Sequence, residues 1–323
     1  MIEKYPIKMI PYCADYIWGG VKLKEKWGKI SSSATLAETW ELSAYEGKNS
    51  FAANGPLNGK SLTEILKIWK DAVGEKGRNY LFFPLLIKFI DAQSNLSVQV
   101  HPDNDYALKN ENQFGKAEMW YIVDADEGSG IYCGFKNKIS PEEFKCGIES
   151  GEIENMLQFM PLKKGQAVFI PPKTVHAIGK GMTIVEIQQN SNLTYRIYDY
   201  KRKDKDGNER ELHVDKAIAV SDLEPLPKEC ISSGEVITDI SGNHFSTVFA
   251  NNYFTVELFE IVNEKEVYIN NESFYAFTFI EGEGTLRTKN STENFIKGDT
   301  FFLPAGLGYI TITGKCKLLL SSL

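Results

Sequence analysis

The chain has 323 residues, of which 42% are hydrophobic and 24% are charged, as in an ordinary globular protein. Its formal net charge is −7 and no basic face stands out, which argues against a nucleic-acid-binding protein. No apolar run approaches the roughly 20 residues of a membrane-spanning helix, and the N-terminus carries no apolar signal segment. The five cysteines include no CxxC pair, so we expect reduced thiols in a cytoplasmic protein.

Helix signals are few, and strand signals dominate the rest of the chain. A capping box that begins at Ser61 predicts a helix over about 61–73, and a second one at Ser140 predicts short helices over about 140–160. Runs rich in β-branched and aromatic residues, separated by turn residues, predict strands. In chain order they are 85–90, 96–100, 118–123, 167–170, 183–188, 254–261, 274–280 and 300–303. Many short strands of this kind are typical of a β-sandwich or barrel.

An internal repeat indicates two related β modules. Residues 164–172 (KGQAVFIPP) reappear as 297–305 (KGDTFFLPA), each with a glycine turn, a strand and a terminating proline. His176 lies eleven residues after Gly165, whereas the same offset in the second copy falls on Tyr309.

A chain of this length is expected to form two domains, because one core rarely grows so large. We place a metal-binding domain at 1–225 and a β domain without that site at 226–323. The linker is expected near 221–233, where Pro225 and Pro227 interrupt a polar stretch.

Four residues of the first module form a candidate metal site. Gln99 and His101 end a strand two residues apart, so their side chains share one face. Glu118 opens the next strong strand, and His176 follows the repeated proline turn. Two imidazoles, a carboxylate and an amide suit Zn²⁺ with one position left open, although Fe²⁺ and Mn²⁺ accept the same donors. Each residue alone has an ordinary surface explanation, and their grouping favours the metal site.

Three cations are candidates for the same site. Lys88 is the only charge in an apolar strand, so it either lines a pocket or snorkels to water at a strand edge. Lys116 precedes Glu118 by two residues and lies either on the same face or in a turn. Arg196 stands among three tyrosines, which suits phosphate or hydroxyl recognition, but a structural ion pair with Asp199 is the alternative.

Several segments resemble the type I mannose-6-phosphate isomerase family, and the short bacterial form in particular. The central ones are 96–102 (LSVQVHP), 115–121 (GKAEMWY) and 171–177 (PPKTVHA), and further matches are 17–20, 38–43 and 188–200. The resemblance runs from about residue 5 to about residue 220 and is looser beyond. It implies two cupin (jelly-roll) β-barrel modules with a small helical insertion, one zinc ion, and interconversion of mannose-6-phosphate and fructose-6-phosphate.

The resemblance also assigns roles to individual residues. The family's zinc ligands fall on Gln99, His101, Glu118 and His176, and its active-site cations fall on Lys88, Lys116 and Arg196. We expect zinc to polarise the carbonyl and stabilise a cis-enediolate. Lys88 is the first candidate for the base, with Lys116 and a zinc-bound water as rivals.

Two other classes of function stay open at this point, together with isomerisation of a different sugar phosphate. A non-haem iron oxygenase would prefer a set richer in histidine, and Gln99 with its neighbouring lysines argues against it. A non-catalytic sugar-phosphate sensor would have less need of a metal site surrounded by cations. In each of these alternatives the partner is a small molecule and neither a nucleic acid nor a membrane, while the oligomeric state is left open.

Overall fold

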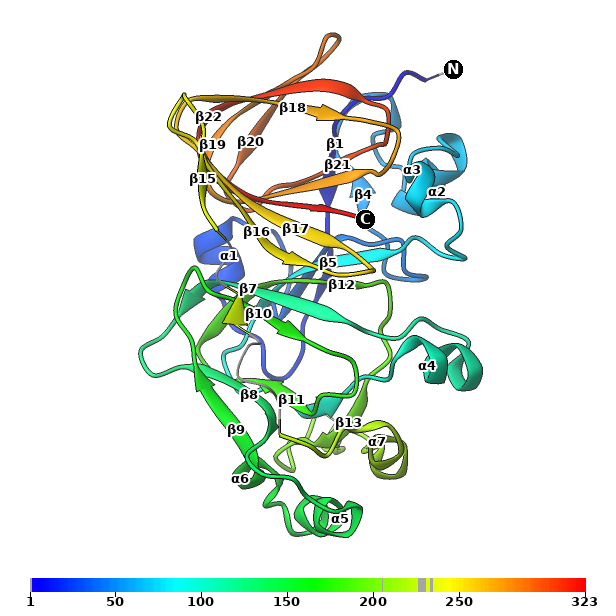
Figure 1. Ribbon diagram of the computed structural model, residues 1–323, viewed down its shortest axis with the longest axis vertical. Helices are drawn as coiled ribbons and strands as arrows, with labels where there is room; N and C mark the ends of the chain where they lie inside the picture. Colours follow the sequence, from blue (N-terminus) through cyan, green and yellow to red (C-terminus); the bar gives the residue numbers. More distant parts are fainter. Residues whose placement is uncertain (1, 205, 226–230, 233–234) are drawn as a thin grey trace.

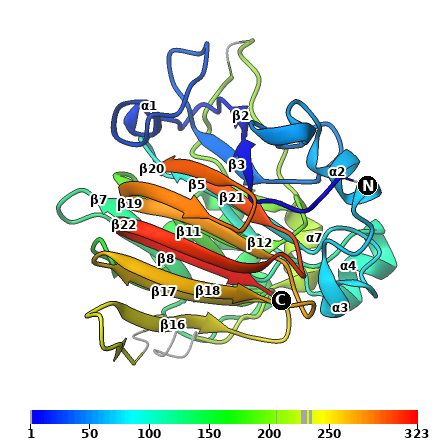
Figure 2. The same ribbon diagram turned by 90° about the horizontal axis from the view of Figure 1, so that it is seen from above.

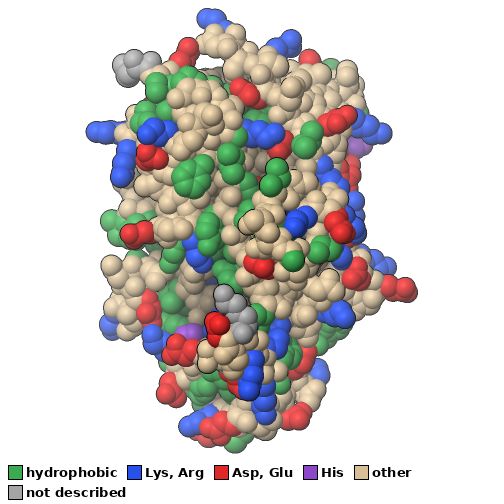
Figure 3. Space-filling view, turned by 180° about the vertical axis from the view of Figure 1, so that it is seen from behind, with side chains coloured by type: hydrophobic (Ala, Val, Ile, Leu, Met, Phe, Trp, Pro, Cys, Tyr) green, Lys and Arg blue, Asp and Glu red, His purple; other side chains and the backbone are tan. Residues whose placement is uncertain are grey.

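The computed structural model describes residues 2–204, 206–225, 231–232 and 235–323. Figure 1 shows an elongated molecule with two β bodies stacked along its long axis, the lower from the middle of the chain and the upper mainly from its C-terminal part. Strands outnumber the short helices, which confirms the mainly β expectation. None of the described helices is long and apolar enough to cross a membrane. Acidic and basic side chains are interspersed over the face seen in Figure 3.

The lower body consists of two antiparallel sheets that share one core. The seven-stranded sheet has the order β14 (Ile231–Ser232), β10 (Ala167–Ile170), β7 (Glu118–Ala125), β12 (Met182–Gln189), β5 (Leu85–Asp91), β3 (Glu38–Leu42) and β2 (Tyr12–Ala14). The five-stranded sheet has the order β13 (Tyr195–Tyr198), β6 (Val98–Val100), β11 (His176–Ile178), β8 (Gly130–Phe135) and β9 (Leu157–Pro161). Apolar side chains from both sheets, such as Trp120 and Ile131, pack in the same cluster. The candidate site residues therefore come from two facing walls of one barrel.

The seven-stranded sheet is buried on both of its faces. All seven residues of β5 are buried, although successive side chains of a strand point to opposite faces. Ile90 packs in the core shared with the five-stranded sheet, whereas Ile87 and Phe89 pack in a core that includes Phe274 and Leu319 of the upper body. This double burial explains why the sequence of β5 is a continuous apolar run instead of an alternating one.

The upper body is a ten-stranded antiparallel sheet. Its main path is β15 (Ile237–Thr238), β16 (His244–Ala250), β17 (Thr255–Ile261), β22 (Gly308–Ser322), β19 (Tyr275–Arg287), β21 (Thr300–Leu303), β1 (Ile7–Ile10) and β4 (Phe51–Ala52). Two further strands branch from it, β18 (Glu264–Ile269) beside β22 and β20 (Thr292–Ile296) beside β19. Figure 2 shows β17, β22 and β19 side by side.

The sheets cross the boundary expected at residue 225 in both directions. Strand β1 pairs with β21, with Ile7 opposite Phe302, so the N-terminus contributes a strand to the upper body. Strand β14 pairs with β10 of the lower body. The division into 1–225 and 226–323 stays a prediction, and part of the expected linker at 221–233 lies outside the described residues. Pairing of β1 with a strand almost 300 residues away leaves no signal in the local pattern that placed the boundary.

Both predicted capping boxes are present at helix starts. Ser61 and Ser140 each accept from the backbone N–H three residues later, and the glutamate there accepts from the serine N–H. The helix that follows the Ser61 capping box ends at Ile68, five residues before the expected end at 73. The helices are α1 (Lys22–Trp27), α2 (Leu62–Ile68), α3 (Gly74–Gly77), α4 (Asn104–Glu111), α5 (Pro141–Ser150), α6 (Ile153–Met156) and α7 (Val214–Val220). In Figure 1, α5 and α6 lie at the end of the molecule remote from the upper body.

The sequence repeat corresponds to a structural repeat, but the barrel interiors differ. Gly165 and Gly298 both adopt a left-handed conformation, with φ of 92° and 96°, just before β10 and β21. The upper core is filled by aromatic and aliphatic side chains, including Phe279 and Phe295 with ring centroids 3.7 Å apart. Tyr309, at the position that corresponds to His176, is 62% exposed and lies outside that core. The described part of the upper body is therefore packed as a structural module.

We expect the upper core to tolerate truncation poorly. Phe279→Ala should lower the free energy of unfolding by about 3–5 kcal/mol, because it opens a cavity among packed aromatic rings. The exposed Tyr309→Ala should cost about 1 kcal/mol or less, since it removes only a cross-strand contact with Tyr268. Urea unfolding followed by circular dichroism measures both variants. Equal effects would show that Phe279 is not in a packed interior.

Candidate functional site

Three of the candidate residues lie next to one another on the five-stranded sheet. Gln99 of β6 is directly opposite His176 of β11 on one side and opposite Arg196 of β13 on the other. Opposite residues of neighbouring strands point to the same face of a sheet, so their side chains form a row. The order of the row is His176, Gln99, Arg196.

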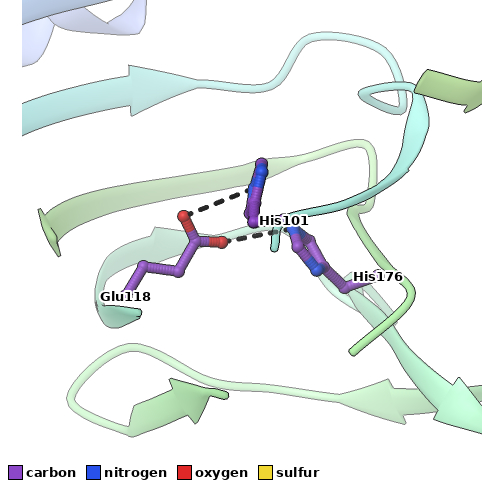
Figure 4. A group of neighbouring side chains, drawn as sticks. All are labelled: His101, Glu118 and His176. Atoms are coloured by element: carbon purple, nitrogen blue, oxygen red, sulfur yellow. Dashed lines mark ion pairs between the residues drawn. The ribbon is translucent and has the colours of Figure 1, made fainter. Parts of the chain in front are cut away.

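The remaining ligand candidates complete a compact cluster. Glu118 comes from the start of β7 in the facing sheet, and His101 follows β6 immediately. The distance from His176 Nε2 to Glu118 Oε1 is 3.2 Å, and that from His101 Nε2 to Glu118 Oε2 is 3.7 Å. Figure 4 shows the two imidazoles and the carboxylate converging on one point. In the part of the chain that the structure describes, this is the one group of three such side chains spaced to hold a metal ion.

Backbone carbonyls orient both imidazole rings. His101 Nδ1 lies 2.8 Å from the carbonyl oxygen of Leu193, and His176 Nδ1 lies 2.8 Å from that of Thr174. A carbonyl oxygen only accepts, so each Nδ1 carries a hydrogen, and in the neutral ring each Nε2 keeps its lone pair. Both lone pairs therefore face Glu118. This outer arrangement is the one usually found around histidines that bind metals.

Electrostatics place the cluster in the protonation state that a metal requires. Burial lowers the pKa of His101 well below its ordinary value, and the Lys116 ammonium adds to the effect. Burial alone would raise the pKa of Glu118, but Lys116 and the two histidines together hold it well below its ordinary value. A neutral His101 and an ionised carboxylate fit a divalent cation.

Gln99 and Lys116 border the same cluster. Gln99 Nε2 lies 3.4 Å from His176 Nε2, and a half turn of the amide exchanges its nitrogen for its oxygen. Lys116 is buried, and its Nζ contacts both His101 Nε2, at 3.1 Å, and Glu118 Oε2. All four expected ligands and one expected cation are thus brought together.

Lys88 lies on the wall formed by the seven-stranded sheet and is paired with two carboxylates. Its Nζ lies 2.9 Å from Glu186 and 3.7 Å from Glu38, and it sits 4.8 Å from the centre of the Trp40 ring. Burial disfavours the charged form, but Glu186 and Glu38 outweigh burial and raise the pKa of Lys88 above the ordinary lysine value. Lys88 is therefore a buried cation and does not snorkel to solvent. Its charge disfavours the expected role of resting-state base.

Arg196 does not form the ion pair with Asp199 that its sequence position allowed. Its Nη1 donates to the carbonyl oxygen of Glu211 at 2.8 Å, and its backbone N–H donates to His213 Nδ1. Its Nε is buried and has no hydrogen-bond partner among the described residues. Asp199 instead pairs with Arg202 and Arg210.

These groups surround one cavity of about 240 Å³. Its lining includes Gln99, Lys116, Lys88, Glu186, Glu38, Arg196 and Arg210. Sequence reasoning did not single out Glu186, Glu38 or Arg210. Glu186 had a usable signal, because it is the one charge within the apolar strand β12, much as Lys88 interrupts the apolar residues of β5. The cavity has four cations in its lining and meets the metal-competent cluster at Gln99 and Lys116, which suits an anionic substrate that has a polarisable oxygen.

Two known protein families match the chain. The family described as "Phosphomannose isomerase type I, catalytic domain" matches residues 7–130. The family described as "Mannose-6-phosphate isomerase, cupin domain" matches residues 245–323. The second match confirms the cupin expectation in the part of the chain where the sequence resemblance is loosest.

Similar proteins match over almost the whole chain. A putative mannose-6-phosphate isomerase of Bacillus subtilis, YvyI, is 37% identical over 317 residues, which are 98% of each chain. A mannose-6-phosphate isomerase of Streptococcus mutans is 35% identical over 288 residues, 89% of each chain. The crystal structure of the mannose 6-phosphate isomerase from Bacillus subtilis matches with a TM-score of 0.91 at 35% identity, covering 98% of this chain and 99% of that one. The chain therefore belongs to the type I mannose-6-phosphate isomerase family.

Proposed function

We propose that this protein interconverts mannose-6-phosphate and fructose-6-phosphate. The observation that carries the proposal is the buried cluster of His101, Glu118 and His176 beside a cavity lined by cations. An aldose–ketose isomerase needs a carbonyl oxygen held against positive charge, because the neighbouring carbon must give up a proton. Family membership supplies the substrate pair, and the small cavity is consistent with one sugar phosphate. A cytoplasmic location remains a prediction from the cysteine content.

We further propose that the cluster holds one Zn²⁺ ion, with Gln99, His101, Glu118 and His176 as its ligands. The support is chemical: the lone pairs of two oriented imidazoles, an ionised carboxylate and an amide oxygen are borderline donors that zinc accepts. When bound, the metal acts as a Lewis acid that polarises the substrate carbonyl.

The chain's own groups then move the proton and balance the charge. One hydrogen leaves C2 of the aldose and returns to C1 of the ketose, while a proton passes from the oxygen on C2 to the oxygen on C1. Lys116 is the lysine in contact with the ligand cluster, so we assign it the carbon-to-carbon proton transfer. Its ammonium must first give up one proton, which a cation bound at Glu118 in its place would favour. Lys88 stays protonated between Glu186 and Glu38 and stabilises the negative charge that develops on the oxygens. Arg196, beside Gln99 in the row, adds a second cation there.

We expect activity to depend on the metal that Glu118 helps to hold. Purified protein should convert mannose-6-phosphate to fructose-6-phosphate, lose that activity with a chelator and regain it with zinc. Glu118→Gln should lower the affinity for the metal at least about 10- to 100-fold, and with it the metal content, because the neutral amide replaces the one anionic ligand. Turnover should fall by at least ~10²-fold. Elemental analysis and a coupled assay on the same sample measure both quantities.

The matched control is Glu127→Gln, an exposed glutamate in the turn after β7. It should retain the metal content and turnover of the wild type. A folded, zinc-loaded wild type without product would refute the isomerase proposal and move the sensor interpretation or another sugar phosphate to the front. Substrate-dependent oxygen uptake would instead favour the oxygenase.

Replacement by arginine should affect turnover differently at the two lysines. Lys88→Arg keeps a permanent cation and should retain turnover within about 10-fold, whereas Lys88→Met should lose about 10²- to 10³-fold. Lys116→Arg should lose about 10²- to 10⁴-fold, since a guanidinium does not give up its proton to act as a base. Exchange of the C2 hydrogen of the substrate with deuterated water measures proton removal directly. If Lys88→Arg were as inactive as Lys116→Arg while its metal content stayed intact, the proton transfer would be assigned to Lys88.

A further inference from the structure

The cavity has a second guanidinium, which is held by a carboxylate outside the ligand cluster. Arg196 and Arg210 both line the cavity. Arg196 is directly opposite Gln99, so it borders the ligands. Arg210 is instead attached to Asp199, which follows β13 three residues after Arg196. Both arginines therefore reach the cavity, and of the two it is Arg196 whose strand position is paired with a ligand residue.

Arg210 is held rigidly by its carboxylate partner. Its Nε donates to Asp199 Oδ2 at 2.7 Å and its Nη2 donates to Oδ1 at 2.5 Å, which is a two-pronged contact. The Asp199 side chain is only 5% exposed, and Arg202 also donates to its Oδ1. Among the described residues, Arg210 Nη1 has no hydrogen-bond partner, so donors remain for a ligand. Such fixation lowers the entropy lost when an anion binds.

This end of the cavity carries more positive charge than its carboxylates balance. Three guanidiniums, those of Arg196, Arg202 and Arg210, share the region with the carboxylates of Asp199 and Glu211. Burial and the nearby Arg210 cation lower the pKa of Arg196, which shows that the cations repel one another. A phosphate ester carries close to two negative charges at neutral pH and three acceptor oxygens. The negative charge and the acceptor oxygens of a phosphate ester match this excess of positive charge and hydrogen-bond donors.

We propose that Arg210 binds the phosphate group of the sugar phosphate and that Asp199 is the positioning residue that holds it there. The proposal rests on the proposed function, because the reacting carbons must lie at the ligand cluster. C1 and C2 are at one end of the open-chain substrate, and the phosphate on C6 lies four carbon–carbon bonds from C2. The arrangement leaves Arg196 for the oxygens near the reacting carbons and Arg210 for the phosphate.

The probe that tests this assignment is glucitol 6-phosphate, which keeps the phosphate and hydroxyls but has no carbonyl. Calorimetric titration of the zinc-loaded protein should show binding about 10- to 100-fold weaker for Arg210→Gln, the loss of hydrogen bonds to a charged group. Arg210→Lys should lie between, because it keeps the charge and loses the two-pronged contact with Asp199. Lys201→Gln, an exposed cation of the same segment, should bind like the wild type.

Kinetics separate this inference from the isomerase proposal. Arg210→Gln should raise KM for mannose-6-phosphate and leave kcat/KM for unphosphorylated mannose unchanged, which a general loss of structure would not do. Unchanged affinity of Arg210→Gln for glucitol 6-phosphate overturns the inference, whether or not the wild type isomerises mannose-6-phosphate. An equal loss in Lys201→Gln also overturns it, since the effect would then be general attraction of an anion. A wild type that binds the probe through Arg210 but forms no product would refute the isomerase proposal alone.

Discussion

The ionised carboxylate of Glu118, wholly buried inside the lower barrel, is the constraint on which the rest of the site depends. A buried carboxylate is costly unless opposite charge and hydrogen bonds surround it. Lys116 contacts one of its oxygens, and His176 lies beside the other. The backbone carbonyls that take the Nδ1 hydrogens leave both imidazoles without a donor at the cluster centre. Two lone-pair nitrogens and a carboxylate at one point form a set of donors that could hold a metal cation.

The same constraint extends along the cavity as a line of alternating charges. Lys116 lies 3.8 Å from Glu186, and Glu186 in turn pairs with Lys88, which Glu38 borders from the next strand. Strand pairing sets this order, because Lys88 of β5 lies directly opposite Glu186 of β12. A slip of one residue between those strands would turn one of the two charges toward the opposite, apolar core and leave the other without its partner. The register of the seven-stranded sheet therefore determines which charges face one another in the cavity.

Sequence reasoning predicted the parts of the site whose signal is local. The spacing of Gln99 and His101 and the lone charge of Lys88 in an apolar run follow from strand geometry, and the family resemblance joined them to Glu118 and His176. Arg210 was missed because it lies in an irregular segment, where only the fold brings it to Asp199 and the cavity. The capping boxes were local as well, while the pairing of β1 with the C-terminal sheet depends on contacts between distant residues. Apart from Glu186, whose lone charge in β12 was a usable local signal, what escaped prediction is what the tertiary fold decides.

The upper body contributes to function through the wall it shares with the lower one. The face of β5 opposite Lys88 packs against upper-body residues such as Phe274, and β1 ties the N-terminus into that body. Lys29 and Glu41, both almost fully buried, form an ion pair, and Lys29 also donates to the carbonyl oxygen of Gly298 in the repeated turn. An uncompensated charge there would be costly, so the pair specifies how the wall meets the upper body. Because the wall carries Lys88 and Glu186, the upper body helps to determine where these charges of the cavity stand.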